Sequence, residues 1–179
     1  MVVEENDALL VQRSLSGDRD AFEALVVKYQ KPMFNVALRI VHDYEDASEV
    51  TQAAFVSAFE NLKHFKPRYK FYSWLYRITV NGSLNFAKGR RRFEGLDDGM
   101  VSIDKQPDEV FSEKDTALIV EQALMKLPPD YRTVIVLSHF QDLSYKEIGD
   151  VLNIPVKTVK SRLFTARQLL KDILIGSGD

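Results

Sequence analysis

The sequence of 179 residues contains no cysteine, and this absence excludes several classes of protein. Disulfide scaffolds, iron–sulfur proteins and zinc sites built on thiolates all require cysteine. No apolar run approaches the roughly 20 residues that a membrane-spanning helix needs. The first seven residues are acidic and lack the basic and apolar segments of a signal peptide. We therefore expect a cytoplasmic protein.

The sequence also lacks the usual signatures of catalysis. The three histidines, His42, His64 and His139, are far apart in the chain, and no H-E-x-x-H, P-loop or G-x-S-x-G motif occurs. Asp97 and Asp98 form a carboxylate pair, but they lie in a segment whose composition predicts flexibility, where preorganisation is poor. We therefore expect no enzyme activity, no cofactor and no metal site.

Acidic residues are absent from one long stretch of an otherwise acidic protein. Residues 61–93 carry nine basic and no acidic side chains, and residues 155–179 carry five basic and two acidic ones, although the whole chain has a net charge of −2. Two separate basic blocks in an acidic protein indicate a polyanionic partner. A solvated helix face is the simpler explanation for one such block alone.

Hydrophobic spacing predicts an all-α protein, because apolar residues recur at helical intervals and no sustained two-residue alternation indicates a sheet. Residues 94–116 are acidic and poor in apolar side chains, which predicts a flexible linker. We therefore expect two small helical domains, at 1–93 and 117–175. Pro32 should kink or break the second helix. Helices are expected near 8–17, 20–31, 33–41, 44–64, 71–92, 117–126, 130–140, 144–152 and 155–173.

Residues 143–164 have the pattern of a helix-turn-helix. Ser144 and Glu147 form an S-x-x-E capping box at the start of one helix, and residues 153–155 supply a turn before the next. The second helix carries one apolar stripe, made of Val156, Val159, Leu163, Ala166 and Leu170. This pattern is typical of a DNA-binding helix-turn-helix, with a plain helical hairpin as the alternative.

Phe164 lies off that apolar stripe, among Lys157, Ser161 and Gln168. An exposed Phe at this place could pack on a thymine methyl group in the major groove. The alternative is a contact with another helix or with the linker, and the sequence leaves the two equally open.

Residues 65–81 interleave cations with aromatic residues. This mixture suits unstacked single-stranded bases, because aromatic faces stack on bases while cations follow the backbone. Some of these aromatics belong to the core, and Trp74 is expected there, beside a stripe made of Phe71, Leu75, Ile78 and Phe86. Asn81 can hydrogen-bond a base edge, although a solvated amide is the simpler alternative.

Five segments of the chain resemble, in order, the extracytoplasmic-function class of bacterial RNA polymerase sigma factors, close to the sigma-E type. Each segment is moderately specific, and together they cover nearly the whole chain. They are GDRDAFEALVVKY at 17–29, DASEVTQAAF at 46–55, FYSWLYRITVN at 71–81, LPPDYR at 127–132, and the run from LSYKEI at 143–148 to Arg162.

The resemblance implies three sites. Domain 1–93 would be sigma domain 2 and domain 117–175 sigma domain 4. Docking on the clamp helices of the largest polymerase subunit would use Asp46, Glu49, Gln52 and Phe55, in a segment where Ser48, Glu49 and Ala53 stand at three positions that are usually acidic in the family. Capture of the melted minus-ten strand would use Phe65, Lys66, Arg68, Tyr69, Lys70, Arg77 and Asn81. Readout of the minus-thirty-five duplex would use Lys157, Thr158, Lys160, Ser161, Arg162 and Phe164.

The resemblance also implies the partners. They are core RNA polymerase, through its clamp helices and flap, promoter DNA, and an anti-sigma factor that could hold the protein near the membrane. A stand-alone helix-turn-helix regulator is the main alternative, but we find no spare apolar helix for the dimer interface that it needs. A purely structural helical adaptor would not explain the two basic blocks. Because the chain is acidic overall, we expect promoter binding to depend on the polymerase.

Overall fold

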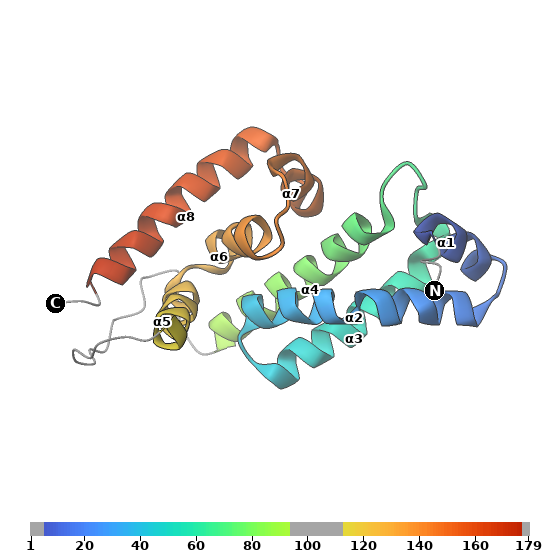
Figure 1. Cartoon of the computed structure of the whole chain (residues 1–179), viewed down its shortest axis with the longest axis horizontal. Coiled ribbons are helices and arrows are strands. Elements are labelled where there is room, and N and C mark those ends of the chain that lie inside the picture. Colours follow the sequence, from blue (N-terminus) through green and yellow to red (C-terminus); the bar gives the residue numbers. More distant parts are fainter. Residues whose placement is uncertain (1–5, 94–112, 177–179) are drawn as a thin grey trace. The chain divides into compact units, whose positions relative to one another are not determined.

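A computed structural model describes residues 6–93 and 113–176, and every regular element in those ranges is helical (Figure 1). The all-α prediction is therefore confirmed. The chain separates into two compact units. Among the described residues, the first unit consists chiefly of 6–86 and the second chiefly of 113–176. The structure leaves most of the predicted linker, 94–112, outside the described residues, but Glu113 already begins a helix.

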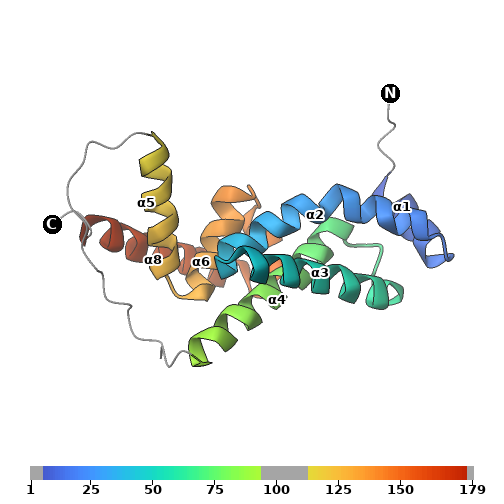
Figure 2. The ribbon, with the colours of Figure 1, turned by 90° about the horizontal axis from the view of Figure 1, so that it is seen from below.

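The first unit is built from α1 to α4, and Figure 2 shows α2 and α3 running side by side. The elements are α1 (Asp7–Leu15), α2 (Arg19–Val41), α3 (Tyr44–Asn61), a single 3-10 turn η1 (Leu62–His64), and α4 (Phe71–Phe93). Their mutual core includes Ala37, Val41, Ala47 and Val50, against which Phe86 of α4 packs. The predicted helices of this unit are thus present, with one difference in α2.

Helix α2 continues through Pro32, so of the two predicted outcomes, a kink or a break, the break is wrong. A proline inside a helix removes one hydrogen bond and costs about 3 kcal/mol. Met33, Val36 and Ile40, in the turns after the proline, are fully buried. Burial of a large apolar side chain contributes about 1.5–3 kcal/mol. Three such side chains outweigh the cost of the proline, and tertiary packing therefore keeps the helix continuous.

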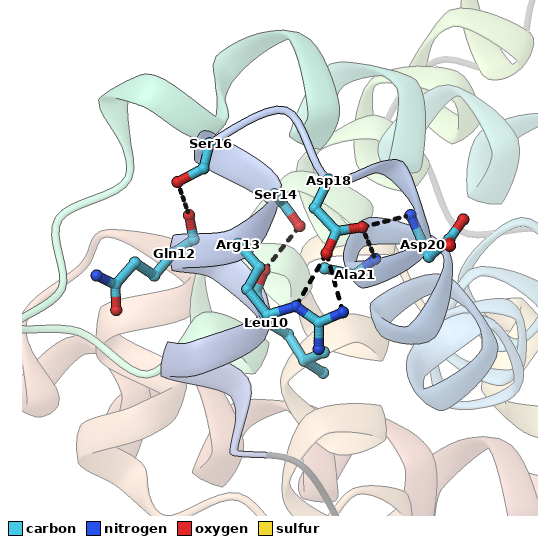
Figure 3. A network of polar contacts seen from close by, with 8 residues as sticks. All are labelled: Leu10, Gln12, Arg13, Ser14, Ser16, Asp18, Asp20 and Ala21. Carbon is cyan, nitrogen blue, oxygen red and sulfur yellow. Dashed lines mark hydrogen bonds and ion pairs between the residues drawn. The ribbon is translucent and has the colours of Figure 1, made fainter.

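The corner between α1 and α2 is held by Asp18, as Figure 3 shows. Its carboxylate caps α2 by accepting hydrogen bonds from the backbone N–H groups of Asp20 and Ala21, at 3.1 and 3.3 Å. It also pairs with the guanidinium of Arg13, whose Nε and Nη2 lie 2.9 Å from Oδ2. The hydrogen bond from Arg13, followed by that from the Ala21 N–H, lowers the pKa of Asp18. Gly17 permits the turn with a φ of +94°.

Helix α4 turns a different stripe toward the core than its sequence predicts. Phe71 and Leu75 are buried as expected, but Ile78 and Phe86 are only half-buried. The buried face continues instead through Tyr76, Thr79, Val80 and Ser83. The hydroxyls of Thr79 and Ser83 donate to the carbonyls of Leu75 and Thr79, four residues earlier in the helix. Small polar residues are therefore accommodated in the core, because the helix itself satisfies their hydroxyl groups.

The second unit contains four helical segments. They are α5 (Glu113–Lys126), α6 (Pro129–Ile135) with a π-helical extension η2 (Val136–Phe140), α7 (Tyr145–Leu152), and α8 (Val156–Gly176). Arg132 is buried and donates to the carbonyls of Met125 and Leu127, at 3.3 and 3.1 Å. These carbonyls lie at the end of α5, where no further helical turn could satisfy them. The buried guanidinium therefore joins α5 to α6.

Candidate nucleic-acid interfaces

The predicted helix-turn-helix is formed by α7 and α8. The Ser144 Oγ and backbone N–H both donate to the Glu147 carboxylate, at 2.8 and 3.0 Å, and the Glu147 N–H donates back to Ser144 Oγ at 3.2 Å. The capping box is therefore confirmed. Asn153 turns the chain with a φ of +54°, and the Ile154 N–H then donates to the Gly149 carbonyl at 3.0 Å.

Gly149 is required by this turn. A Cβ atom built on Gly149 would lie 2.9 Å from the carbonyl oxygen of Ile154, which is closer than real contacts allow. The Ile154 oxygen belongs to the backbone and cannot move aside as a flexible side chain could. Only glycine therefore lets the turn pass this close to α7.

Helix α8 buries one face and exposes the other. Val159, Leu163 and Ala166 are fully buried, as the sequence predicts, whereas Val156 is exposed and Leu170 half-buried. Phe164 is 66% exposed and follows Leu163, which is 1% exposed. Among the remaining predicted contact residues, Thr158 and Arg162 are half-buried, and Lys157, Lys160 and Ser161 are exposed. The predicted contact face therefore carries both cations and an aromatic ring.

In the first unit, residues 65–70 form the loop between η1 and α4. The loop turns tightly, since the Tyr69 N–H donates to the Lys66 carbonyl at 3.0 Å. Arg68 lies over the ring of Tyr69, 4.8 Å from its centroid, and Lys70 lies 5.5 Å from the ring of Tyr72. Lys66, Arg68, Tyr69 and Lys70 are all exposed. The sequence alternation of cations and aromatics thus becomes a surface on which both face solvent.

Phe65 anchors this loop to the first unit. It is half-buried, with ring centroids 5.8 Å from Phe71 and 5.3 Å from Trp74. Trp74 itself is half-buried, so it belongs to an aromatic cluster at the edge of the core and not to the deep core that we expected. Because the loop is fixed by this cluster, its exposed side chains project from a defined place.

A cavity of about 720 Å³ lies beside the loop, within the first unit. Its size falls in the range of about 300–1,000 Å³ that is usual for ligand sites. Phe65, Tyr69 and Lys70, all predicted as minus-ten contacts, line it. The other lining residues come from α1 and its cap, from α2, from Pro67 in the loop and from α4, and are Asn6, Asp7, Ala8, Val11, Gln12, Leu15, Lys28, Pro67, Phe71 and Tyr72.

Four of the predicted minus-ten residues do not line the cavity. They are Lys66 and Arg68 in the loop, and Arg77 and Asn81 on α4. At 100° per residue, Arg77 and Asn81 lie about 140° and 180° around α4 from Tyr72, which does line it. The contribution of α1 was missed by the sequence reasoning, because its short apolar pattern indicates only that it packs and not on what.

The predicted polymerase-docking helix is α3. Its N-terminus is capped by Asp43, whose carboxylate accepts from the N–H groups of Glu45 and Asp46 at 2.9 and 3.0 Å. Glu49 and Gln52 are exposed, and Asp46 is half-buried. Phe55 is only 7% exposed, so its placement in the docking surface is wrong. The aromatic side chain lies on the core side of α3 together with Val50 and Ala54.

Two apolar residues of α3 are exposed, although the sequence did not predict either of them as a surface contact. Val56 is 58% exposed and Phe59 is 53% exposed. With Glu49 and Gln52 they occupy positions i, i+3, i+7 and i+10, which lie on one face of a helix. We name Glu49, Gln52, Val56 and Phe59 the α3 face. The Phe59 ring contacts Phe22 of α2 edge-on, with centroids 5.0 Å apart.

The described parts of the chain lack two other kinds of site. Within residues 6–93 and 113–176, no helix has the length and apolar character that a membrane crossing requires. In the same ranges, no three histidine or acidic side chains gather as they would around a metal ion.

Comparison with known proteins identifies the family. Residues 25–93 match the family model for sigma-70 region 2, and residues 117–170 match that for sigma-70 region 4. The chain is 37% identical to the RNA polymerase sigma-H factor of Pseudomonas aeruginosa, over 97% of this chain and 96% of that protein. It is 35% identical to the ECF RNA polymerase sigma-E factor of Escherichia coli K12, over 92% of each. The chain belongs to the extracytoplasmic-function sigma factors.

Two solved structures have a similar fold. The structure of CnrH in complex with the cytosolic domain of CnrY has a TM-score of 0.73 and 27% identity, over 96% of this chain and 99% of that chain. The sigma factor RpoE of Bartonella quintana, solved with the anti-sigma factor NepR, has a TM-score of 0.65 and 21% identity, over 86% of this chain and 96% of that chain.

Family membership defines the activity of the protein. It is an alternative sigma factor that directs transcription, with core RNA polymerase and promoter DNA as its partners. Sigma factors are initiation factors without enzymatic activity of their own, in agreement with the absence of catalytic motifs from the sequence.

Proposed function

We propose that the chain divides promoter recognition between its two units. The first unit captures the melted minus-ten strand at the loop of residues 65–70, and the second reads the minus-thirty-five duplex with α8. The observation that carries this proposal is the cavity of about 720 Å³ beside an exposed loop of alternating cations and aromatics. A cavity of this kind suits an unstacked base, whereas the exposed face of a single helix suits a major groove.

At the minus-ten element, the side chains have three roles. Phe65 and Tyr69 offer aromatic faces to the captured base, and each stacking contact contributes about 1–3 kcal/mol. Lys66, Arg68 and Lys70 neutralise phosphates on either side of that base. Arg77 and Asn81, which do not line the cavity, contact the strand where it continues along α4.

At the minus-thirty-five element, the exposed face of α8 supplies both kinds of contact. Lys157, Lys160 and Arg162 provide positive charge for phosphates or guanine edges, and Thr158 and Ser161 provide hydroxyl groups. Phe164 is exposed next to these cations, which favours packing on a thymine methyl over a contact in the core of its own unit. A cation that contacts only phosphate should strengthen binding to every duplex equally.

Core polymerase docks on the α3 face. Glu49 and Gln52 of this face can make hydrogen bonds or ion pairs at the rim of an interface. Val56 and Phe59 supply apolar area for its centre. The Asp43 cap holds the first turn of this helix, and Asp46 lies in that turn. We assign docking to Glu49, Gln52, Val56 and Phe59, with Asp46 at the margin and Phe55 as a core support.

Docking is tested by titrating the labelled chain with bacterial core RNA polymerase and following fluorescence anisotropy. Glu49→Arg reverses one charge on the α3 face, and Glu23→Arg makes the same change at an exposed position of α2. We expect the first variant to weaken binding at least tenfold and the second to leave it within twofold. Equal binding by both variants would remove α3 from the interface, and no binding by the unaltered chain would contradict the docking proposal.

Duplex readout is tested with the holoenzyme on DNA that carries a paired minus-thirty-five element. Lys160→Ala should reduce the slope of log K against log salt by about one, because one phosphate contact is lost. Lys171→Ala, at the far end of the same helix, is the matched control and should leave the slope unchanged. A sequence-dependent loss in Lys160→Ala would show that Lys160 reads a base instead of the backbone.

We also infer that an anti-sigma protein controls the chain in the cytoplasm and holds it near the membrane until transcription is needed. The likeness to CnrH, which was solved with the cytosolic domain of CnrY, supports a cytosolic protein partner. Fractionation of cells that carry the tagged chain tests this. The chain should sediment with membranes before induction and with core polymerase after it, and a chain always found with polymerase would contradict the inference.

A further inference from the structure

An acidic residue lies in the wall of the cavity in the first unit, which is unexpected for a surface that receives DNA. Asp7, at the start of α1, lines the cavity together with Lys28 of α2. Its Oδ1 accepts a hydrogen bond from Lys28 Nζ at 2.9 Å, and its Oδ2 accepts one from the Tyr29 hydroxyl at 2.5 Å. The carboxylate is thereby held in one orientation by two partners from the same helix.

The ion pair changes what this wall can bind. An isolated carboxylate would repel the phosphates of a DNA strand, but Lys28 neutralises it at contact distance. Each carboxylate oxygen has two lone pairs, so one acceptor site remains on each oxygen after the two hydrogen bonds. The wall therefore presents hydrogen-bond acceptors without net charge, in the cavity that Phe65, Tyr69 and Lys70 of the loop also line.

We propose that Asp7 selects the base captured in the cavity by accepting a hydrogen bond from its exocyclic amino group. This inference rests on the proposed capture of an unstacked base. Cytosine, adenine and guanine each carry such an amino group, and acceptance by Asp from the cytosine amino group is an established pairing. Thymine has no amino group, and its single ring N–H lies between two carbonyl oxygens that a carboxylate repels. Asp7 thus selects against thymine in the cavity.

The competing explanation is that Asp7 has only a structural role, in which its hydrogen bonds hold α1 against α2. The two explanations differ in what they require of the carboxylate. A fastening role needs the bonds to Lys28 and Tyr29, whereas a selective role needs an acceptor that faces the base. Tyr29→Phe removes one of the fastening bonds and keeps the carboxylate, and Asp7→Asn replaces the carboxylate by an amide that can donate to a thymine carbonyl.

The experiment uses holoenzyme made from the full chain and core RNA polymerase. The probe is a pool of forked DNA in which the unpaired non-template strand is randomised, and the bound fraction is sequenced. For the unaltered chain we expect thymine to be depleted about tenfold at one unpaired position, within the usual discrimination of a good base contact. Asp7→Asn should abolish this depletion at that position alone, and Tyr29→Phe should retain it.

Each outcome has a distinct meaning. If Asp7→Asn keeps the thymine depletion while Tyr69→Ala removes it, the cavity captures a base but Asp7 does not select it, and the inference is wrong. If Asp7→Asn and Tyr29→Phe lose the depletion together, with equal shifts in melting followed by Trp74 fluorescence, Asp7 is a fastening residue and the inference is again wrong. If the unaltered chain shows no base preference at any unpaired position, the proposed capture itself fails.

Discussion

The two regions to which we assign promoter recognition are built in different ways. In the second unit, one helix provides both the buried stripe that holds it and the exposed face that we assign to the duplex. In the first unit, the cavity needs α1, α2, the loop of residues 65–70 and the start of α4 together. On a contact face formed by one helix, a single side chain can be replaced without moving the others. A cavity formed by several segments keeps its shape only if the contacts between those segments are kept.

This difference teaches where mutations should act. On α8, neighbouring positions separate the buried stripe from the proposed contact face, since Leu163 is buried and Phe164 exposed. Around the cavity, one residue can belong both to the packed interior and to the proposed binding surface. Phe65 lines the cavity and also packs against Trp74. The chain has a single tryptophan, so its fluorescence reports on the first unit alone.

The largest expected effect comes from Leu163→Ala. Removing this fully buried side chain should reduce the free energy of unfolding of the second unit by about 3 kcal/mol. A unit of this size is marginally stable, so its helices should melt at low temperature in far-UV circular dichroism.

Phe164→Ala is the control for Leu163→Ala. It should leave stability within about 0.5 kcal/mol and weaken promoter binding. The unfolding transition of the first unit, followed by Trp74 fluorescence, should occur at the same temperature in the unaltered chain, in Leu163→Ala and in Phe164→Ala. A shift of the Trp74 transition in Leu163→Ala would mean that the two units unfold together.

The next largest effect is expected for Gly149→Ala. The new Cβ must displace the backbone at Ile154, which should cost about 1–3 kcal/mol in the second unit and misplace α8. Gly89→Ala is the control, since nothing lies within 4 Å of its Cβ, and the change should stabilise α4 by about 0.4–1 kcal/mol. Thermal melts and duplex binding are compared, and unchanged duplex binding by Gly149→Ala would contradict the requirement for glycine.

A smaller effect is expected for Asp43→Ala in the first unit. Loss of the cap on α3 should reduce the free energy of unfolding by about 1 kcal/mol, as measured by denaturant titration of Trp74 fluorescence. Because the α3 face begins only one to two turns later, core polymerase binding should also weaken, whereas Asp43→Asn should retain both. A variant that loses stability but binds polymerase fully would show that fraying at the start of α3 does not reach Glu49.

The smallest effect concerns pH. The pKa of Asp18 is lowered in the folded protein, chiefly by Arg13, so its contribution to stability is present above the ordinary Asp pKa. It should be lost as the pH falls through the lowered value. Asp18→Asn should therefore be less stable than the unaltered chain at neutral pH, and the two should converge in acid. Asp20→Asn, in the same helical turn, is the control, and a constant difference between the chains at every pH would contradict this assignment.

A feature of this protein could be predicted from the sequence when the residues that form it are close together in the chain. The capping box at Ser144 was predictable, because its hydrogen bonds join residues three apart. The stripe of α8 was predictable because helical spacing alone separates Leu163 from Phe164. The continuity of α2 through Pro32 was not, since it depends on how deeply the next turns are buried. The burial of Phe55 and the exposure of Phe59 likewise depend on the angle at which α3 meets its neighbours.

By itself, the sequence determined that the chain is helical, that it belongs to the sigma factors and that α8 carries a cationic face. These properties follow from spacing along one helix or from short motifs, in which the interacting residues are neighbours. Only the tertiary structure decided that the cavity includes α1 and that Asp7 and Lys28 meet in its wall, 21 residues apart in the chain. Such a contact depends on packing between helices, and no local pattern of residues encodes it.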